Sequence, residues 1–378
     1  MHTNFTAAKR PQGNPINLTC AGRGLLVLWR MIPLRKTVHG VGKLIALRSP
    51  RLRRLSRLLF GLLLGASQAW SEPVPLHGRP AAELASTLLR AGDQSGMTQA
   101  LLAASGEDRE LPYQLRWHPF AAGPALMEAL NAGAIDIGVV GNAPPVFAQA
   151  GGFEVRIVAA AEGAQNNNAL LLPAGSGIRT SADLKGKRIA VAKGSSAHYL
   201  LLAALSEAGL TMADTRVSYV SPVDAQNAFA SGHLDAWAVW YPFVGQATSR
   251  GAQRLLDGSR WPETGLNFTV ASQAALNDPL RAELIGDLIQ RLARAQAWAT
   301  ANPEPWAEHL AGVTRLPLAL VREMLAHQQL RYVPLDDRVG GLQQRLADAF
   351  YQARLIPRPL HALESFDQRY NSLLPENH

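Results

Sequence analysis

Short apolar runs alternate with amphipathic segments from Leu88 onward. The apolar runs LLRAGDQ, YQLRWHPF and AIDIGVVG have the length and composition of strands. Between them, MTQALLAASG and GPALMEALNAG space their apolar residues three and four apart, and they end near Gly106 and Gly133. Glycine is the usual residue just past a helix end. Alternating strands and helices of this kind predict an α/β fold.

The same order of elements returns near Asp183. The segment DLKGKRIAVAKGSSAHYLLLAALSEAGL predicts a turn, a strand and a helix, and the strand RVSYV, the helix DAQNAFASG and the strand LDAWAVW follow it. ALNAGAIDIGVVGN (129–142) also aligns with AFASGHLDAWAVWY (228–241). We therefore expect two similar α/β units whose strands end at one crevice, the usual ligand site of open α/β sheets.

Within this repeat, Gly133 aligns with Gly232 and Asp136 with Asp235. We expect the two aspartates to cap or brace their turns rather than to contact a ligand. Trp237 should point into the core by strand alternation, whereas Trp240 should leave its strand at the level of the crevice.

The C-terminal third is predicted to be helical. DPLRAELIGDLIQRLARAQAWATANPE predicts a long helix that begins near Pro279 and stops near Pro303, and further helices are expected at about 316–329 and 337–353. We interpret their apolar stripes as packing. The predicted domains are 88–170 plus 271–378, which includes these helices, and 171–270. The chain should cross between them near 170–173 and 268–271, where a hinge would let the lobes close on a ligand.

The charge is concentrated at the N-terminus. The chain of 378 residues has a formal charge of +8, but residues 1–69 contain twelve basic and no acidic residues, which leaves 25 basic against 29 acidic residues and a net charge of −4 elsewhere. The nine-residue apolar run LLFGLLLGA is shorter than the roughly 18 residues that a membrane span needs.

Residues 1–69 are therefore predicted to be an export signal region. Cleavage is expected after Ala69, since Ser67 and Ala69 are small residues at the positions that signal peptidase requires. Translation would start at Met31, because the basic region is too long for an ordinary signal. An uncleaved anchor is the alternative, and the sequence does not separate the Sec route from the Tat route. Cys20, the only cysteine, would be removed.

Two loops after predicted strands have the composition of ligand-binding helix starts. In GNAPPVFAQAGG, Gly141 ends a strand, Asn142 or Ala143 can cap a helix, and two prolines occupy its first turn. In KGSSAHYLL, Ser195 and Ser196 begin a helix after Gly194. Helix N-termini attract anions because their N–H groups are unpaired and the helix dipole is positive there.

Neighbouring residues complete the predicted pocket. Gln94 and Ser95 follow the first strand, the loop 120–123 follows the second, and Trp240 and Tyr241 follow the repeated strand. These groups are neutral donors without a fixed cation. GDQSG lacks the Gly-x-Ser-x-Gly pattern of a hydrolase nucleophile, and neither metal-spaced histidines nor a phosphate-binding glycine loop is present. The sequence therefore predicts neither catalysis nor a metal or cofactor.

Three segments together resemble the aliphatic-sulfonate-binding proteins of ABC transporters, a family with taurine and nitrate relatives. They are GAIDIGVVGNAPPVFAQAGG, DLKGKRIAVAKGSSAHYLLLAALSEAGL and GHLDAWAVWYPF, and the resemblance runs from about Leu88 to the C-terminus. It implies a periplasmic binding protein of type II, with two similar α/β domains, a ligand cleft between them and a helical C-terminal region. Such a protein is a periplasmic monomer, catalyses nothing, and binds neither nucleic acid nor membrane directly. It passes a sulfonate to a permease and its ATPase for sulfur acquisition.

The resemblance also implies a set of ligand-binding residues: Gln94, Ser95, Gly141, Asn142, Ser195, Ser196, His198, Trp240 and Tyr241. Many relatives have an acid where Asn142 stands, and an acid could meet a ligand amine. We therefore expect an aliphatic or aryl tail without charge rather than taurine. Alternative ligands are nitrate, an organosulfate, taurine itself and a thiamine-pyrimidine precursor. The export signal argues against a pyrimidine-synthesis enzyme of the same fold, and the lack of a helix-turn-helix argues against a sensor that regulates transcription.

Overall fold

The computed structural model describes residue 76 and residues 78–374. The predictions for the export signal, Met31, Cys20 and Ala69 lie outside the described residues. Within the described part of the chain, every helix is too short or too polar to cross a membrane.

The first sheet has six strands in the order β11-β4-β10-β3-β1-β2. Its strands are β1 (Leu88–Gln94), β2 (Gln114–Phe120), β3 (Ile137–Gly141), β4 (Val155–Glu162), β10 (Leu266–Ser272) and β11 (Arg331–Val333). β1 pairs in parallel with β2 and β3, while β10 runs antiparallel to both β3 and β4. Predictions for β1, β2 and β3 are confirmed, with Asp136 falling just before β3.

The second sheet has five strands in the order β7-β6-β8-β5-β9. Its strands are β5 (Asn168–Leu172), β6 (Arg188–Val191), β7 (Arg216–Tyr219), β8 (Ala236–Trp240) and β9 (Gln253–Asp257). β6 pairs in parallel with β7 and β8, which matches the pattern of β1 with β2 and β3. The mixed sheets and their helices confirm the predicted α/β class.

Twelve α-helices surround these sheets in the described residues. They are α2 (Ala81–Ser86), α3 (Met97–Ser105), α4 (Gly123–Asn131), α5 (Ala143–Ala150), α6 (Ser196–Glu207), α7 (Pro222–Ala230), α8 (Phe243–Thr248), α9 (Gln273–Asn277), α10 (Pro279–Ala301), α11 (Pro303–Thr314), α12 (Leu318–Ala326) and α13 (Asp337–Gln352). The predicted long helix is α10, and Pro303 both follows it and begins α11.

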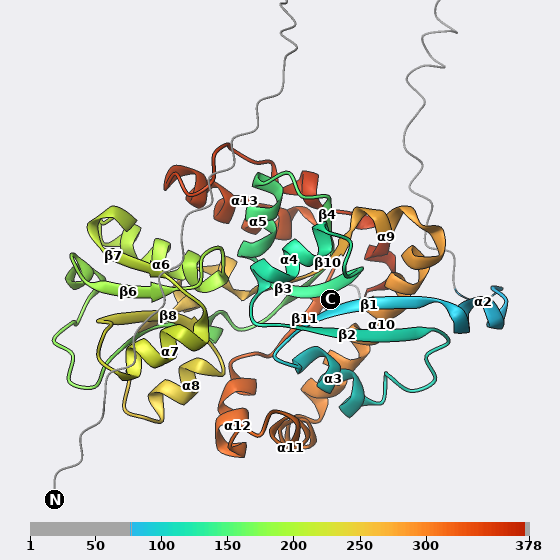
Figure 1. Ribbon diagram of the computed structural model, residues 1–378, viewed down its shortest axis with the longest axis horizontal. Coiled ribbons are helices and arrows are strands. Elements are labelled where there is room, and N and C mark those ends of the chain that lie inside the picture. The colour runs from blue at the N-terminus through green and yellow to red at the C-terminus, as the bar shows by residue number, and fades with distance from the viewer. Residues whose placement is uncertain (1–75, 77, 375–378) are drawn as a thin grey trace, which may run out of the picture. The chain divides into compact units, whose positions relative to one another are not determined.

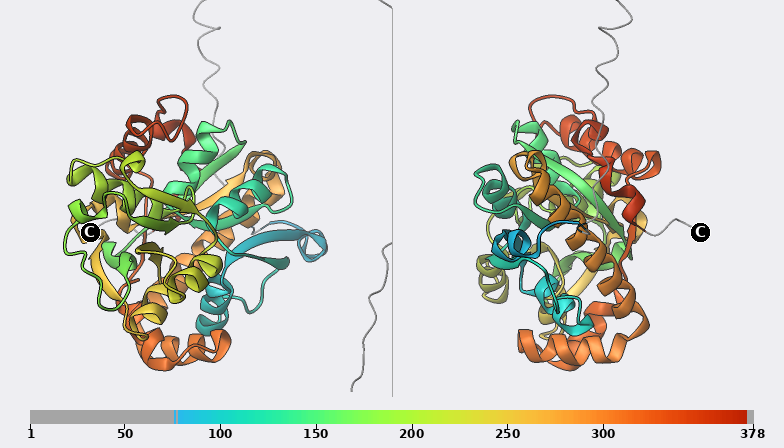
Figure 2. Two further views of the ribbon diagram at one scale, coloured as in Figure 1. Left: turned by 60° about the vertical axis from the view of Figure 1, so that its left-hand side comes forward. Right: turned by 90° about the vertical axis from the view of Figure 1, so that its right-hand side faces the viewer.

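Two hydrophobic cores cover opposite faces of the six-stranded sheet. Leu89 and Ala91 pack with α3 and with Leu284 and Leu288 of α10, whereas Val140 and other residues pack with α4 and α13. Figure 1 shows the five-stranded sheet with α6, α7 and α8 beside the six-stranded sheet, and α11 and α12 below them. The turned views in Figure 2 keep α11 and α12 at the same end.

The repeat has a structural counterpart in two equivalent Arg–Asp pairs. The N–H and guanidinium of Arg90 both donate to the Asp136 carboxylate, and the N–H and guanidinium of Arg188 donate to Asp235 in the same way. Each arginine also donates to the carbonyl of the aligned glycine, Gly133 or Gly232. Both aspartates therefore brace their turns, as predicted.

The chain crosses between the sheets earlier than the sequence suggested. The first crossing covers residues 163–167, between β4 and β5, and the second covers 258–265, between β9 and β10. The predicted positions 170–173 and 268–271 are wrong because they fall mostly in buried strands, where Leu170 and Phe268 are fully enclosed. The division into two domains that close about a hinge stays a prediction.

Candidate ligand-binding cleft

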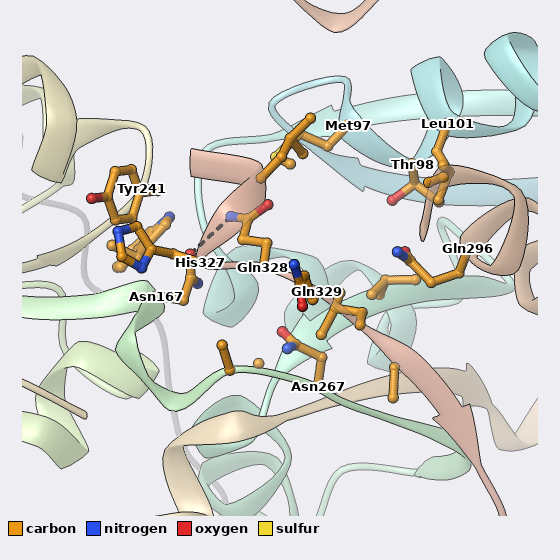
Figure 3. Close-up of a pocket in the computed structure, with 18 of the residues that line it drawn as sticks. Met97, Thr98, Leu101, Asn167, Tyr241, Asn267, Gln296, His327, Gln328 and Gln329 are labelled. Carbon is orange, nitrogen blue, oxygen red and sulfur yellow. Dashed lines mark hydrogen bonds between the residues drawn. The ribbon is translucent and has the colours of Figure 1, made fainter. Parts of the chain in front are cut away.

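A cavity of about 590 Å³ lies where strand ends of both sheets meet. It is lined from the first sheet by the ends of β1 and β3 and from the second by the start of α6 and the end of β8. This volume is within the range of small-molecule sites. Figure 3 shows the cavity with Tyr241, Asn167 and His327 at one side and Leu101, Thr98 and Gln296 at the other.

Most of the sequence-predicted ligand residues meet in this cavity. Those that line it are Gln94, Ser95, Gly141, Ser195, Ser196, Trp240 and Tyr241. The structure therefore brings together four loops that lie between positions 94 and 241 of the chain. Asn142 and His198 do not line the cavity, and the reasons differ for the two.

The N-terminus of α6 presents unpaired donors to the cavity. The Ser195 hydroxyl donates to the Ala192 carbonyl over 2.7 Å and accepts the His198 N–H over 3.2 Å, so it serves as the helix cap. Among the described residues, the N–H groups of Ser196 and Ala197 and the Ser196 hydroxyl have no hydrogen-bond partner. These groups are the ones that α6 can offer to an anion.

Gly141 lies directly against Ser196, which brings the two sheets together at this point. A Cβ atom built on Gly141 would collide with Ser196 Oγ, at a distance that no real contact shows. A side chain at the end of β3 would therefore turn the Ser196 hydroxyl away from its present position, whereas glycine leaves it in place. This agrees with the sequence-based expectation that Gly141 keeps side-chain atoms away from the site.

The first loop contributes side chains rather than a helix terminus. The buried Asp93 carboxylate accepts the N–H groups of Thr98 and Gln99, each over 3.1 Å, so the N-terminus of α3 already has an anion. Burial raises the pKa of Asp93, and these N–H donors oppose that shift. Gln94 donates to the Val139 carbonyl over 2.8 Å, and Ser95 adopts a left-handed φ of 60°.

Asn142 is fully buried away from the cavity. Its side-chain amide donates to the Glu263 carbonyl over 2.5 Å, and its own carbonyl accepts the Gln343 amide of α13 over 2.8 Å. The side chain does not cap α5, although Asn142 occupies the N-cap position. A packing contact with a helix 200 residues away thus replaces the predicted ligand contact.

His198 supports the Ser195–Ser196 turn from inside the protein. Its Nδ1 atom accepts the Gly194 N–H over 3.2 Å, and its Nε2 atom is 3.4 Å from the Tyr219 hydroxyl. The ring is fully buried beside Phe147 and Phe350. Burial, with a smaller effect of the Lys193 charge, lowers the pKa of His198 from 6.5 to about 4. His198 is therefore neutral at pH 7.

Two aromatic residues from the end of β8 form one wall of the cavity. Trp240 is partly exposed there, whereas Trp237 is buried against Phe229, as predicted. The Tyr241 hydroxyl donates to Glu323 and accepts from Arg254, each over 2.7 Å, so only its ring is available to a ligand. Burial raises the pKa of Tyr241.

Several polar residues that the sequence did not predict also line the cavity. They come from the crossing segment, from β10, from the last turns of α10 and from the segment after α12: Asn167, Asn267, Gln296, Thr300, His327, Gln328 and Gln329. The C-terminal helices therefore do more than pack, because α10 and the segment after α12 also line the cavity. The run HQQ, between α12 and β11, was the available signal, because three consecutive polar residues interrupt the apolar pattern there.

The comparisons extend over most of the described chain. Residues 121–305 match the family model described as NMT1/THI5 like. A putative aliphatic sulfonates-binding protein of Escherichia coli K12 is 37% identical over 74% of this chain and 88% of its own length. The taurine-binding periplasmic protein of E. coli K12 is 28% identical over 53% of this chain and 62% of its own length.

Solved structures agree with this match. The alkanesulfonate-binding protein SsuA from Xanthomonas axonopodis pv. citri, bound to MOPS, is 36% identical with a TM-score of 0.69, over 77% of this chain and 99% of that one. The periplasmic aliphatic sulphonate binding protein SsuA from E. coli is 35% identical with a TM-score of 0.66, over 74% and 92%. The desulfurization enzyme DszB, at 17% identity and a TM-score of 0.56, shares the fold alone.

Two sheets joined by two crossings, with a cavity at their facing strand ends, define a periplasmic binding protein fold. Within that class, this chain belongs to the family of aliphatic-sulfonate-binding proteins.

Proposed function

We propose that this protein is the periplasmic solute-binding component of an ABC importer and captures an organosulfonate in the cavity between its two sheets. The sulfonate is passed to a permease driven by its ATPase, and the protein acts as a monomer that catalyses no reaction. The sulfonate group would contact the Ser196 hydroxyl and the N–H groups of Ser196 and Ala197. Gln94 and Ser95 face it from the other lobe, and the Trp240 and Tyr241 rings wall the site.

The unpaired donors of α6 are the observation that carries this proposal. Among the described residues that line the cavity, the charged ones are Arg322 and Glu304, and they pair with each other over 3.0 and 3.1 Å. An anion in the cavity must therefore be held by neutral donors. A sulfonate suits such a site because it stays a monoanion over the whole biological pH range and offers three acceptor oxygens.

Taurine is a poorer ligand on the same reasoning. Its ammonium group would need an acceptor with negative charge, but Asn142 is buried and neutral, and Glu304 is already paired with Arg322. An enzyme that uses a cysteine nucleophile is also disfavoured, since the chain has one cysteine, Cys20, within the segment predicted to be removed.

Serine variants test the proposal by titration calorimetry with an alkanesulfonate. Ser196→Ala should weaken binding by about 1 to 3 kcal/mol, which is about 5- to 150-fold in Kd, because a charged ligand loses a hydrogen bond. Its melting temperature without ligand should not change. Ser195→Ala should instead lower the stability of the free protein by about 1 kcal/mol, because a helix cap is lost.

The matched control is Ser206→Ala, an exposed serine near the other end of α6. It should change neither affinity nor stability. Equal affinity of Ser196→Ala and the parent protein would refute the proposed sulfonate position. Binding of nitrate or an organosulfate in preference to every sulfonate would refute the proposed ligand.

A further inference from the structure

The cavity extends well beyond the donors of α6 into what we call the tail compartment. Its walls come from α3, from the end of α10, from α11 and from the segment around the end of α12. The residues used below are Leu101, Gln296, Trp306, Leu325 and Gln329, together with Asn267 of β10. A ligand whose sulfonate meets Ser196 would project its tail toward this space.

The walls of the tail compartment belong to the first lobe and to the C-terminal helices. α3 packs against both α10 and α11, and α11 packs against α12. Leu101 and Trp306, on α3 and α11, are almost fully buried in the same hydrophobic core. α12 also packs against α8 of the second lobe, and its Glu323 accepts a hydrogen bond from the Tyr241 hydroxyl, so contacts from both lobes hold the compartment in shape.

Three side-chain amides of the tail compartment are unpaired. Among the described residues, Asn267, Gln296 and Gln329 make no side-chain hydrogen bond, and Figure 3 shows their amide ends turned toward the same space. Each amide offers both donors and an acceptor, which matches a hydroxyl group. Leu325 and Leu101 supply apolar surface beside them.

The charges of the compartment cancel. Arg322 and Glu304 form an ion pair at its edge, with about half of each side chain exposed. A tail with an ammonium or a carboxylate group would have to compete with this pair, whereas a neutral tail would not. An alkyl tail without oxygen would cover the three amides and leave them without partners, which is unfavourable.

We propose that the tail compartment selects aliphatic sulfonates whose tail is uncharged and carries several hydroxyl groups, in the manner of a sugar sulfonate. This inference rests on the proposed function of the cavity. As the sequence predicted, the tail is uncharged. Instead of a plain alkyl or aryl group, however, it carries hydroxyl groups that form hydrogen bonds to Asn267, Gln296 and Gln329.

Competition binding with matched ligands tests this inference on the purified protein. The probes are a hexose with a sulfonate on carbon 6, 1-hexanesulfonate and taurine. We expect the hexose sulfonate to bind about tenfold or more tightly than 1-hexanesulfonate, because each satisfied amide contributes a modest net gain. The double variant Gln296→Met/Gln329→Met should lose this preference, because methionine keeps the length of glutamine without its hydrogen bonds.

Gln290→Met is the control, since Gln290 is on the same helix α10 and does not line the cavity. It should preserve the preference. The inference would be overturned if 1-hexanesulfonate bound as tightly as the hexose sulfonate or more tightly. It would also be overturned if the double variant kept the parent's preference. Either result would leave the proposed function standing. No binding by any sulfonate would overturn both.

Discussion

His198 makes the stability of this protein depend on pH in a predictable direction. The groups against its ring are the Tyr219 hydroxyl, the Phe147 and Phe350 rings and, at longer range, the Lys193 ammonium. None of them carries the negative charge that would favour an imidazolium. Protonation would also remove the acceptor that Nδ1 offers to the backbone, so the folded state favours the neutral ring.

The size of the effect follows from the two pKa values. In the unfolded chain His198 titrates near 6.5, and in the folded protein its pKa is about 4. Its neutral form therefore supports full stability above about pH 6.5, and this contribution is lost as the pH falls from there toward about 4, because the unfolded chain takes up the proton first. Between pH 7 and pH 4.5 the free energy of unfolding should fall by about 2 kcal/mol from this residue.

Urea unfolding of the parent protein and of His198→Gln at pH 7 and pH 4.5 measures this pH-dependent loss of stability. Carboxylates and other histidines also titrate in that range, so the quantity of interest is the difference between proteins. His198→Gln should lose about 2 kcal/mol less than the parent protein on acidification. His233→Gln, at an exposed histidine, is the control and should behave as the parent does. An equal loss in the parent and in His198→Gln would refute this account of the buried ring.

Two further substitutions test contacts that shape the cleft. Gly141→Ala should weaken sulfonate binding by about 1 to 3 kcal/mol in a calorimetric titration, because the new methyl group must push Ser196 away; unchanged affinity would show that this close approach is dispensable. Asp136→Asn should lower the free energy of unfolding in urea by about 3 kcal/mol, the low end for a broken buried pair, since its arginine is partly exposed. Asp235→Asn, in the more exposed Arg188–Asp235 pair, should lower the free energy of unfolding clearly less. Equal losses in the two variants would show that burial does not set the strength of these pairs.

The sequence predicted the elements whose pattern is local. β1, β2, β3 and the repeat were recognisable because alternating apolar runs, helix-ending glycines and the paired Asp136 and Asp235 lie within single short segments. β4, β10 and β11 were not assigned, because their pairing joins residues more than a hundred positions apart and no local pattern encodes such a partner.

The candidate site was predicted in part for the same reason. Ser196 and Gly141 were identified from loop chemistry alone, and they lie in the cavity. Asn142 and His198 have equally suitable chemistry, but residues of α13, Gln343 and Phe350, pack over them from the far end of the chain. Gln296 was missed because it lies on α10, whose apolar stripe dominates the periodicity of that segment. Asn267 and Gln329 were missed because β10 was not assigned and the segment after α12 was expected to be helical.

A crystal structure of the protein with a bound alkanesulfonate tests the central claim most directly. Our account predicts sulfonate oxygens within about 2.7 to 3.2 Å of the Ser196 hydroxyl and of the N–H groups of Ser196 and Ala197, with the tail directed toward α10 and α11. A sulfonate bound elsewhere, or one held by the Arg322 guanidinium instead of α6, would contradict it.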